Sequence, residues 1–319
     1  MNNLPDPAVA RLRRVLDEPD LTGTRYQLLE ELGRGGMGTV YAAEDRELGR
    51  RVALKVLPAW DAGRASDAAQ RLLQEARILA QLEHPGIVPI HDAGVLPDGR
   101  VFYAMKRVEG RRLDQVRQGA SRFDLLRLFL KVCDPVAFAH SRQIIHRDLK
   151  PENVMVGAFG EVLVLDWGIA KLQIADCGLQ IEKQTIAGTP GYMAPEQAAG
   201  KDVDARTDVY GLGGILYSLL VGRAPGVEPG PPRRIDRSIA KPLEAICLKA
   251  LGGDPAARYV TVAELQADVA RYLDGAAVTA YRENLLEVAA RWVTRNRTLV
   301  LLVLAYLIMR AVLLFFLGR

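Results

Sequence analysis

The chain has 319 residues, of which 49% are hydrophobic and 25% are charged. These proportions are ordinary for a globular protein and exclude a disordered or fibrous chain. The net charge of +4 is carried by residues 282–319, which contain six arginines and two glutamates. A basic excess confined to the neighbourhood of an apolar run indicates a membrane surface, and we expect no nucleic-acid partner. The three cysteines are far apart, which argues against a zinc site and indicates a reducing compartment.

Residues 1–25 contain scattered prolines and charges and are predicted to form a short leader without a signal peptide. A strand is expected over residues 26–32, followed by a glycine-rich segment over 33–40 and a second strand. The glycines let the backbone approach phosphate groups closely and present its N–H groups. A glycine-rich turn alone is weak evidence. The next strand, over 52–56, strengthens it because it carries Lys55 among apolar residues.

Lys55 has two interpretations. Its side chain either extends to solvent along an apolar surface or pairs with an acidic residue. Glu75, in the helical pattern of residues 72–79, is available for such a pair. A further strand is expected over residues 101–108. His84 stands before Pro85 and is interpreted as structural rather than as a metal ligand.

Residues 146–153 place an acid, a base and an amide within eight positions. They lie between a buried helix, predicted from the apolar pattern of 125–139, and a short strand over 162–165 that runs into Asp166. Asp148 can accept the proton of a hydroxyl group, and Lys150 can neutralise charge on a phosphoryl group. Asn153 and Asp166 supply oxygen ligands of the kind that Mg²⁺ prefers. The segment therefore predicts phosphoryl transfer to a hydroxyl group.

The sequence His-Arg-Asp-Leu-Lys-Pro-Glu-Asn over 146–153, together with Asp-Trp-Gly over 166–168, resembles the motifs of the eukaryotic-type protein kinases. The glycine-rich segment and the strand that carries Lys55 resemble the ATP-binding strands of the same family. The resemblance covers about residues 26–275 and is strongest to bacterial serine/threonine kinases of the Gly-Gly-Met-Gly type. It implies an α+β, bilobal fold with a small antiparallel-sheet N-lobe (about 26–107) and a mostly helical C-lobe (about 108–275). Lys150, two residues after Asp148, marks serine/threonine rather than tyrosine specificity in that family.

The resemblance also implies ATP and Mg²⁺ (or Mn²⁺) as cofactors, and proteins with serine or threonine residues as substrates. The implied catalytic residues are Asp148, Lys150, Lys55 and Glu75, of which the last two form an ion pair. The implied metal ligands are Asn153 and Asp166. The residues expected to contact the nucleotide, including a gatekeeper at position 105 and a hinge residue at position 108, are Leu32, Gly33, Arg34, Gly35, Gly36, Met37, Gly38, Thr39, Val40, Ala53, Lys55, Met105 and Val108.

Two structural roles follow from the resemblance: Glu196 pairs with Arg258, and Asp208 braces the backbone of the catalytic loop. Two departures stand out. Trp167 replaces the usual phenylalanine, and residues 226–232 are too short and too rich in glycine and proline for the helix that the family has there. The helical pattern resumes over 235–251. The shortened C-lobe supports an alternative function, a catalytically weak pseudokinase that acts as a scaffold.

Residues 169–195 are expected to be the activation loop. Arg147, directly before Asp148, marks kinases of this family that are activated by phosphorylation of that loop. Thr189 is expected to contact the catalytic loop, which leaves Thr185 as the regulatory site, modified in trans when the protein self-associates on a membrane. The alternative is that Thr185 is an unmodified, exposed residue.

Residues 299–317 are apolar except for Arg310 and are long enough to cross the bilayer, after a basic juxtamembrane segment over 276–298. More arginines precede the run than follow it, so the positive-inside rule places residues 26–275 in the cytoplasm. We therefore expect a single-pass protein of the inner (cytoplasmic) membrane. The alternative is a tail helix that packs on a partner, with Arg310 at its polar edge.

Overall fold

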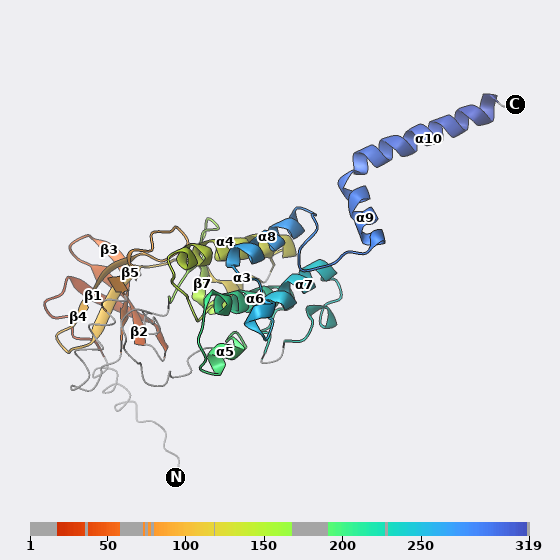
Figure 1. Cartoon of the computed structure of the whole chain (residues 1–319). Coiled ribbons are helices and arrows are strands. Elements are labelled where there is room, and N and C mark those ends of the chain that lie inside the picture. Colours follow the sequence, from red (N-terminus) through yellow and green to blue (C-terminus); the bar gives the residue numbers. More distant parts are fainter. Residues whose placement is uncertain are drawn as a thin grey trace, which may run out of the picture.

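The computed structural model describes residues 18–35, 38–57, 73, 76–77, 80–117, 119–167, 191–226 and 229–317. Strands form one lobe and helices form most of the other, and two helices at the C-terminal end project away from the helical lobe (Figure 1). This arrangement confirms the predicted α+β, bilobal fold. The strands of the N-lobe are β1 (Tyr26–Gly35), β2 (Gly38–Asp45), β3 (Arg50–Val56), β4 (Ile90–Val95) and β5 (Val101–Lys106).

The N-lobe strands form one antiparallel sheet in the order β1-β2-β3-β5-β4. Side chains alternate between the two faces of each strand, so Leu54 and Lys55 point in opposite directions. The sheet face that carries Leu54 packs a small separate core, which includes Tyr41 and Phe102. On the other face Lys55 is paired with Tyr103, which belongs to the large core of the C-lobe. This second face is therefore the one that meets the C-lobe.

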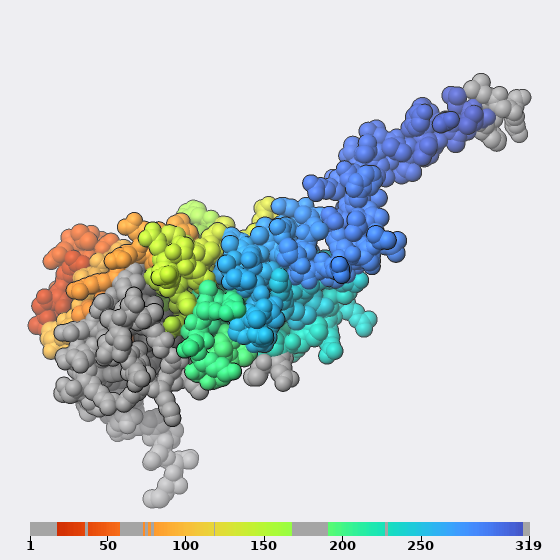
Figure 2. Space-filling model, viewed as in Figure 1, coloured from red at the N-terminus to blue at the C-terminus, as the bar shows by residue number. Residues whose placement is uncertain are grey.

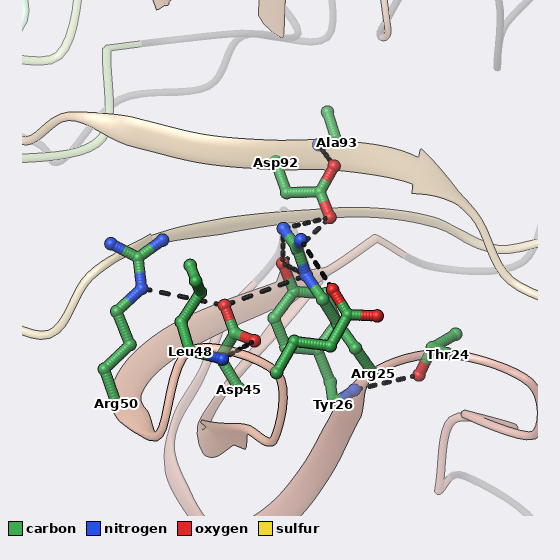
Figure 3. Close-up of polar contacts among 9 residues, drawn as sticks. Thr24, Arg25, Tyr26, Asp45, Leu48, Arg50, Asp92 and Ala93 are labelled. Atoms are coloured by element: carbon green, nitrogen blue, oxygen red, sulfur yellow. Dashed lines mark hydrogen bonds and ion pairs between the residues drawn. The ribbon is translucent and has the colours of Figure 1, made fainter.

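A polar cluster fixes the ends of four strands to one another (Figure 3). Asp45 is fully buried between the guanidinium groups of Arg25 and Arg50, at 3.7 and 3.6 Å. Arg25 also pairs with Asp92 at 3.0 Å, and the Tyr26 hydroxyl donates to the same carboxylate at 2.8 Å. The cluster joins β4 to the end of the β1–β2 hairpin that lies opposite the glycine-rich turn, where Tyr26 pairs with Asp45.

The C-lobe is built around the long helix α4, which packs against α6 and α8. The Ser121 side chain caps α4 by accepting a hydrogen bond from the Asp124 amide, and α6 ends at Gly222, whose φ of 83° suits glycine. Apolar residues of α4 and α6, such as Phe129 and Leu216, are fully buried in the main core. The C-lobe elements are β6 (Arg111–Arg112), α3 (Leu113–Val116), α4 (Arg122–Ser141), η1 (Pro151–Asn153), β7 (Val154–Val156), β8 (Val162–Val164), α5 (Pro195–Ala198), α6 (Ala205–Val221), η3 (Pro232–Arg234), α7 (Lys241–Ala250), η4 (Pro255–Ala257) and α8 (Val262–Leu273).

Some predicted boundaries were wrong. Helix α7 begins at Lys241 rather than at position 235, because Asp236 forms a turn with the Ser238 amide and Pro242 starts the first helical turn. Strand β5 ends at Lys106, two residues before the predicted end at position 108. Between α6 and α7 the described residues contain only the short η3, in agreement with the expected lack of a further helix.

Two helices follow the C-lobe: α9 (Leu285–Arg295) and α10 (Arg297–Leu317). They extend away from the body of the protein in the space-filling view (Figure 2). Helix α10 begins two residues before the predicted apolar run, and its segment Arg297–Leu314 is long and apolar enough to cross a membrane. Helix α9 lies within the segment that the sequence suggested only as a basic juxtamembrane connection.

Candidate active site

The loop between α4 and β7 is held by one buried acid, Asp208 of α6. Its carboxylate accepts hydrogen bonds from the amides of His146 and Arg147, each at 2.8 Å, and contacts Nε2 of His140 at 2.7 Å. Burial alone would raise the pKa of Asp208, but the hydrogen bonds from His140 and from the His146 amide hold it below its usual range. Arg147 has a φ of 66°, which a non-glycine residue adopts only where the surroundings fix it. The loop is therefore a rigid support for the residues that follow.

Asp148, Lys150 and Asn153 converge on the far side of this loop. The Lys150 ammonium lies 3.1 Å from Oδ2 of Asp148, and the Asn153 amide nitrogen donates to the same oxygen at 3.2 Å and to the Asp148 carbonyl at 2.8 Å. The three side chains predicted from the sequence thus form one hydrogen-bonded group. The Lys150 ammonium and the Asn153 amide fix the position of the carboxylate within the loop.

Lys55 and Asp166 meet between the two lobes. The Lys55 ammonium, with a residue exposure of 7%, lies 2.6 Å from Oδ1 of Asp166. Burial would raise the pKa of Asp166, but the charge and the hydrogen bond of Lys55, together with the nearby Lys150, lower it. Asp166 has a φ of 51°, so the chain turns sharply at the end of β8. The ionised pair joins the N-lobe sheet to the C-lobe loops.

Tyr103 is a further member of this group that the sequence analysis missed. It stands directly opposite Lys55 in the β3–β5 pairing, and the Lys55 ammonium lies 5.9 Å from the centre of its ring. Burial raises the pKa of Tyr103 to about 12, although the Lys55 charge acts in the other direction. The phenol therefore stays neutral beside the lysine. The pairing register that brings the two residues together could not be read from either strand alone.

Asn153 and Asp166 could hold a divalent metal ion. The Leu165 amide donates to the Asn153 carbonyl at 2.8 Å, so residues 153 and 166 lie at the same end of the β7–β8 hairpin. Since the Asn153 amide nitrogen is used by Asp148, its Oδ1 oxygen is the atom left for a ligand. A carboxylate and an amide oxygen fit Mg²⁺ and Mn²⁺, which prefer oxygen ligands. Among the described residues no group of three or more His, Cys, Asp and Glu side chains could hold a metal by itself.

The predicted nucleotide-contacting residues surround the Lys55 face of the N-lobe sheet. Ala53 pairs with Met105, and Val40 pairs with Lys55, so their side chains share that face. Gly38 has a φ of 118°, and a Cβ there would run into the Val56 carbonyl, so the turn requires glycine at this position. The remaining described members of the set lie in the second half of β1, at the start of β2 and just after β5: Leu32, Gly33, Arg34, Gly35, Thr39 and Val108. Gly36, Met37 and Glu75 lie outside the described residues, as does the loop that contains Thr185.

Trp167 fills the position after Asp166 with a buried aromatic ring. Its indole N–H donates to the Val164 carbonyl at 3.1 Å, and its ring lies 4.8 Å from the ring of His146. Burial lowers the pKa of His146, whose Nε2 contacts the Leu165 carbonyl at 2.9 Å. The tryptophan therefore supports the same loops that a smaller aromatic residue would support, and it adds a hydrogen bond to the backbone.

Glu196 and Arg258 form the predicted buried pair. Both guanidinium nitrogens Nη1 and Nη2 lie 2.7 Å from the Glu196 carboxylate, and the Thr207 hydroxyl donates to it at 2.9 Å. The neighbouring Gln197 donates to the Arg147 carbonyl at 2.7 Å. Helix α5 is thus connected both to the C-lobe core and to the catalytic loop.

One lobe is an antiparallel sheet that carries a buried lysine, and the other is a helical lobe that carries the Asp148 loop. This arrangement defines the protein kinase class of fold. Residues 26–249 match the protein kinase domain family, and the chain belongs to that family. The resemblance seen in the sequence is confirmed.

Similar proteins are bacterial serine/threonine kinases. The chain is 37% identical over 286 residues to a probable serine/threonine-protein kinase of Streptomyces coelicolor, covering 83% of this chain and 42% of that protein. It is 38% identical over 283 residues to the serine/threonine-protein kinase PknB of Mycolicibacterium smegmatis, covering 82% of this chain and 45% of that protein. The crystal structure of the Mycobacterium tuberculosis PknI kinase domain, a double mutant, has a TM-score of 0.64 at 27% identity, covering 80% of this chain and 98% of the other. The chain spans less than half the length of the two curated relatives.

Proposed function

We propose that the chain is a serine/threonine protein kinase that transfers the γ-phosphoryl group of ATP to serine or threonine hydroxyls of proteins. The observation that carries the proposal is the Lys55–Asp166 contact of 2.6 Å, next to the loop on which Asp148, Lys150 and Asn153 meet. Lys55 anchors the nucleotide phosphates, and Glu75 is assigned as its ion-pair partner during catalysis. Lys150 marks serine/threonine specificity in the family.

Asp148 accepts the proton of the substrate hydroxyl, and Asn153 and Lys150 hold its carboxylate in position. Lys150 stabilises the negative charge that spreads over the transferred group. Asn153 and Asp166 hold Mg²⁺, or Mn²⁺, which when bound neutralises phosphate charge. The glycine-rich turn covers the phosphates with backbone N–H groups, and Leu32, Val40, Ala53, Met105 and Val108 enclose the base.

A pseudokinase scaffold is the competing function. The short connection between α6 and α7, which contains only η3 among the described residues, suggested this alternative, but the similar proteins are serine/threonine kinases and do not favour it. The lysine, the base and both proposed metal ligands are also present and brought together. Incubation of the full-length chain with radiolabelled ATP, Mg²⁺ and a generic basic protein should give phosphoserine or phosphothreonine, and chelation of the metal should abolish it. A protein that binds ATP but transfers no label would be a pseudokinase.

We also propose that α10 anchors the chain in the inner (cytoplasmic) membrane as a single span, with the kinase domain in the cytoplasm. None of its side chains from Arg297 to Leu314 is buried, as expected of a surface in contact with lipid. Arg310 costs about 2.5–3.5 kcal/mol near the centre of a span, but the Leu, Ile, Val and Phe residues each return about 0.3–0.6 kcal/mol. Arg291, Arg295 and Arg297 precede the span and favour the cytoplasmic side. Full-length protein should resist extraction by alkaline carbonate, and release by salt alone would contradict the anchor.

A further inference from the structure

Helix α9 (Leu285–Arg295) has a wide apolar face that nothing in the described part of the chain covers. At 100° per residue, six apolar side chains fall on one continuous arc, and Glu287, Arg291, Thr294 and Arg295 fall on the opposite side. Leu285 and Leu286 are 88% and 82% exposed, and Trp292 is 54% exposed. The apolar residues of this arc, called the α9 face below, are Leu285, Leu286, Val288, Ala289, Trp292 and Val293.

The polar side of α9 is attached to the kinase domain. Lys241, at the start of α7, lies 3.0 Å from the Glu287 carboxylate, and the Tyr281 hydroxyl donates to the same carboxylate at 3.0 Å. Arg291 pairs with Glu283 at 2.8 Å. These contacts turn the polar side of the helix toward the C-lobe, so the α9 face points outward.

The segment that leads to α9 is also fixed to the C-lobe. Asp268 of α8 is fully buried and accepts hydrogen bonds from the Thr279 amide (2.8 Å), the Thr279 hydroxyl (2.7 Å) and the Ala280 amide (3.0 Å). The Tyr259 hydroxyl donates to the same carboxylate at 2.9 Å. A buried carboxylate with this many donors holds the backbone firmly. The kinase domain is therefore connected to α9 by a fixed segment rather than by a free linker.

Two observations identify what covers the α9 face. Only Asn296 separates α9 from α10, so α9 lies at the level where the proposed membrane span begins. Arg295 and Arg297, both exposed, add positive charge there, which complements anionic phospholipid headgroups. A helix with one apolar face, basic residues on the other and a membrane anchor beside it has the properties of an interfacial helix.

We propose that α9 lies in the plane of the membrane surface, with the α9 face buried at the boundary between headgroups and acyl chains. This inference rests on the proposed anchoring by α10. Because the polar side of α9 is bonded to α7, the helix holds the C-lobe in one orientation against the bilayer. The kinase would then act on substrates near the membrane surface.

Trp292 reports directly on this position. The chain has three tryptophans, at 60, 167 and 292, so the Trp292→Phe variant isolates the signal of the one on the α9 face. Full-length protein is reconstituted in vesicles of phosphatidylcholine with a minority of phosphatidylglycerol, with bromine placed near the headgroup end of the acyl chains. We expect the wild type to lose clearly more fluorescence to the brominated lipid than Trp292→Phe loses. Equal quenching of the two proteins would overturn the proposal.

A matched pair of variants separates the α9 face from the rest of the helix. Leu286→Glu places a negative charge on the apolar face, whereas Thr294→Glu places the same charge on the polar side at another exposed position. Quenching of Trp292 should fall strongly in Leu286→Glu and stay near the wild-type value in Thr294→Glu. Equal loss in both would overturn the proposal. The proposal would also be overturned if Trp292 emission changed with protein density but not with brominated lipid, because a second copy of the protein would then cover the α9 face.

Carbonate extraction of the same samples distinguishes the two proposals. Protein that is released by carbonate would contradict the anchoring by α10. Protein that is retained while Trp292 is not quenched would contradict only the interfacial position of α9.

Discussion

Replacement of Arg258 by methionine tests how the Glu196–Arg258 pair supports the C-lobe. Arg258 is 3% exposed and bonds both Glu196 oxygens at 2.7 Å, as well as the carbonyls of Gly252 (2.7 Å) and Arg206 (2.9 Å). Methionine fills similar volume without charge, so Glu196 would remain buried with only the Thr207 hydroxyl as a side-chain donor. Breaking a buried pair in this way costs about 3–5 kcal/mol. The unfolding free energy of an ordinary domain is about 5–15 kcal/mol in total, so this loss would be a large share of it.

Urea unfolding of the kinase domain within the full-length protein measures this cost. We expect a lower midpoint with an unchanged slope, because the surface exposed on unfolding stays the same. The double variant Glu196→Gln/Arg258→Met should be more stable than Arg258→Met alone, since it leaves no charge without a partner. A loss below about 1 kcal/mol for Arg258→Met would equal that of an exposed ion pair and would refute the argument.

The pH dependence of the same variant gives a second check. Burial would raise the pKa of Glu196, but the hydrogen bonds from Arg258 outweigh burial and lower it below the ordinary value of 4.5. The wild-type pair therefore contributes stability above the unfolded pKa and loses it as the pH falls through the lower, folded pKa. In Arg258→Met only burial remains strong, so the folded pKa should rise above the ordinary value. The difference in unfolding free energy between the two proteins should then shrink as the medium becomes acidic. A difference that stays constant would contradict this explanation.

Three further predictions concern the catalytic site. Lys55→Met should lower kcat by about 10²–10³-fold, as measured in steady state, because the phosphates lose their anchor and Asp166 loses its ion-pair partner; activity near that of the wild type would contradict the assigned role. Tyr103→Leu should lower the unfolding free energy in urea by about 1–2 kcal/mol, because the buried Lys55 ammonium loses the aromatic ring beside it; an unchanged midpoint would show that the ring does not stabilise the charge. Thr185→Ala should lower activity after preincubation with Mg·ATP, because a phosphate of about −2 charge can no longer form near Arg147; mass spectrometry that finds no phosphate on wild-type Thr185 would exclude it as a regulatory site.

The catalytic loop could be predicted because its chemistry is local in the sequence. Asp148, Lys150 and Asn153 lie within six residues of one another, so a single loop can bring them together. The Glu196–Arg258 pair spans 62 residues and was predicted only because the family resemblance supplied it. The contacts of Asp208 with the loop backbone were predicted in the same way.

Tyr103 and the α9 face could not be predicted by these means. Tyr103 is one of several apolar and aromatic residues in its strand, and only the β3–β5 register shows that it stands opposite Lys55. In the sequence of α9, apolar and basic residues are interspersed, and the net charge of the segment suggested only a basic connection to the membrane span. Its orientation depends on Glu287 meeting Lys241, which lies 46 positions away in the sequence.

The measurement that tests the proposed function most directly compares full-length wild type with Asp148→Asn. The asparagine keeps the shape of the loop but cannot accept the proton of a substrate hydroxyl. We expect the variant to bind ATP in the presence of Mg²⁺ as the wild type does, while transfer of labelled phosphate to a protein substrate is abolished. Transfer at the wild-type rate would show that Asp148 is not the base and would contradict the account of this site.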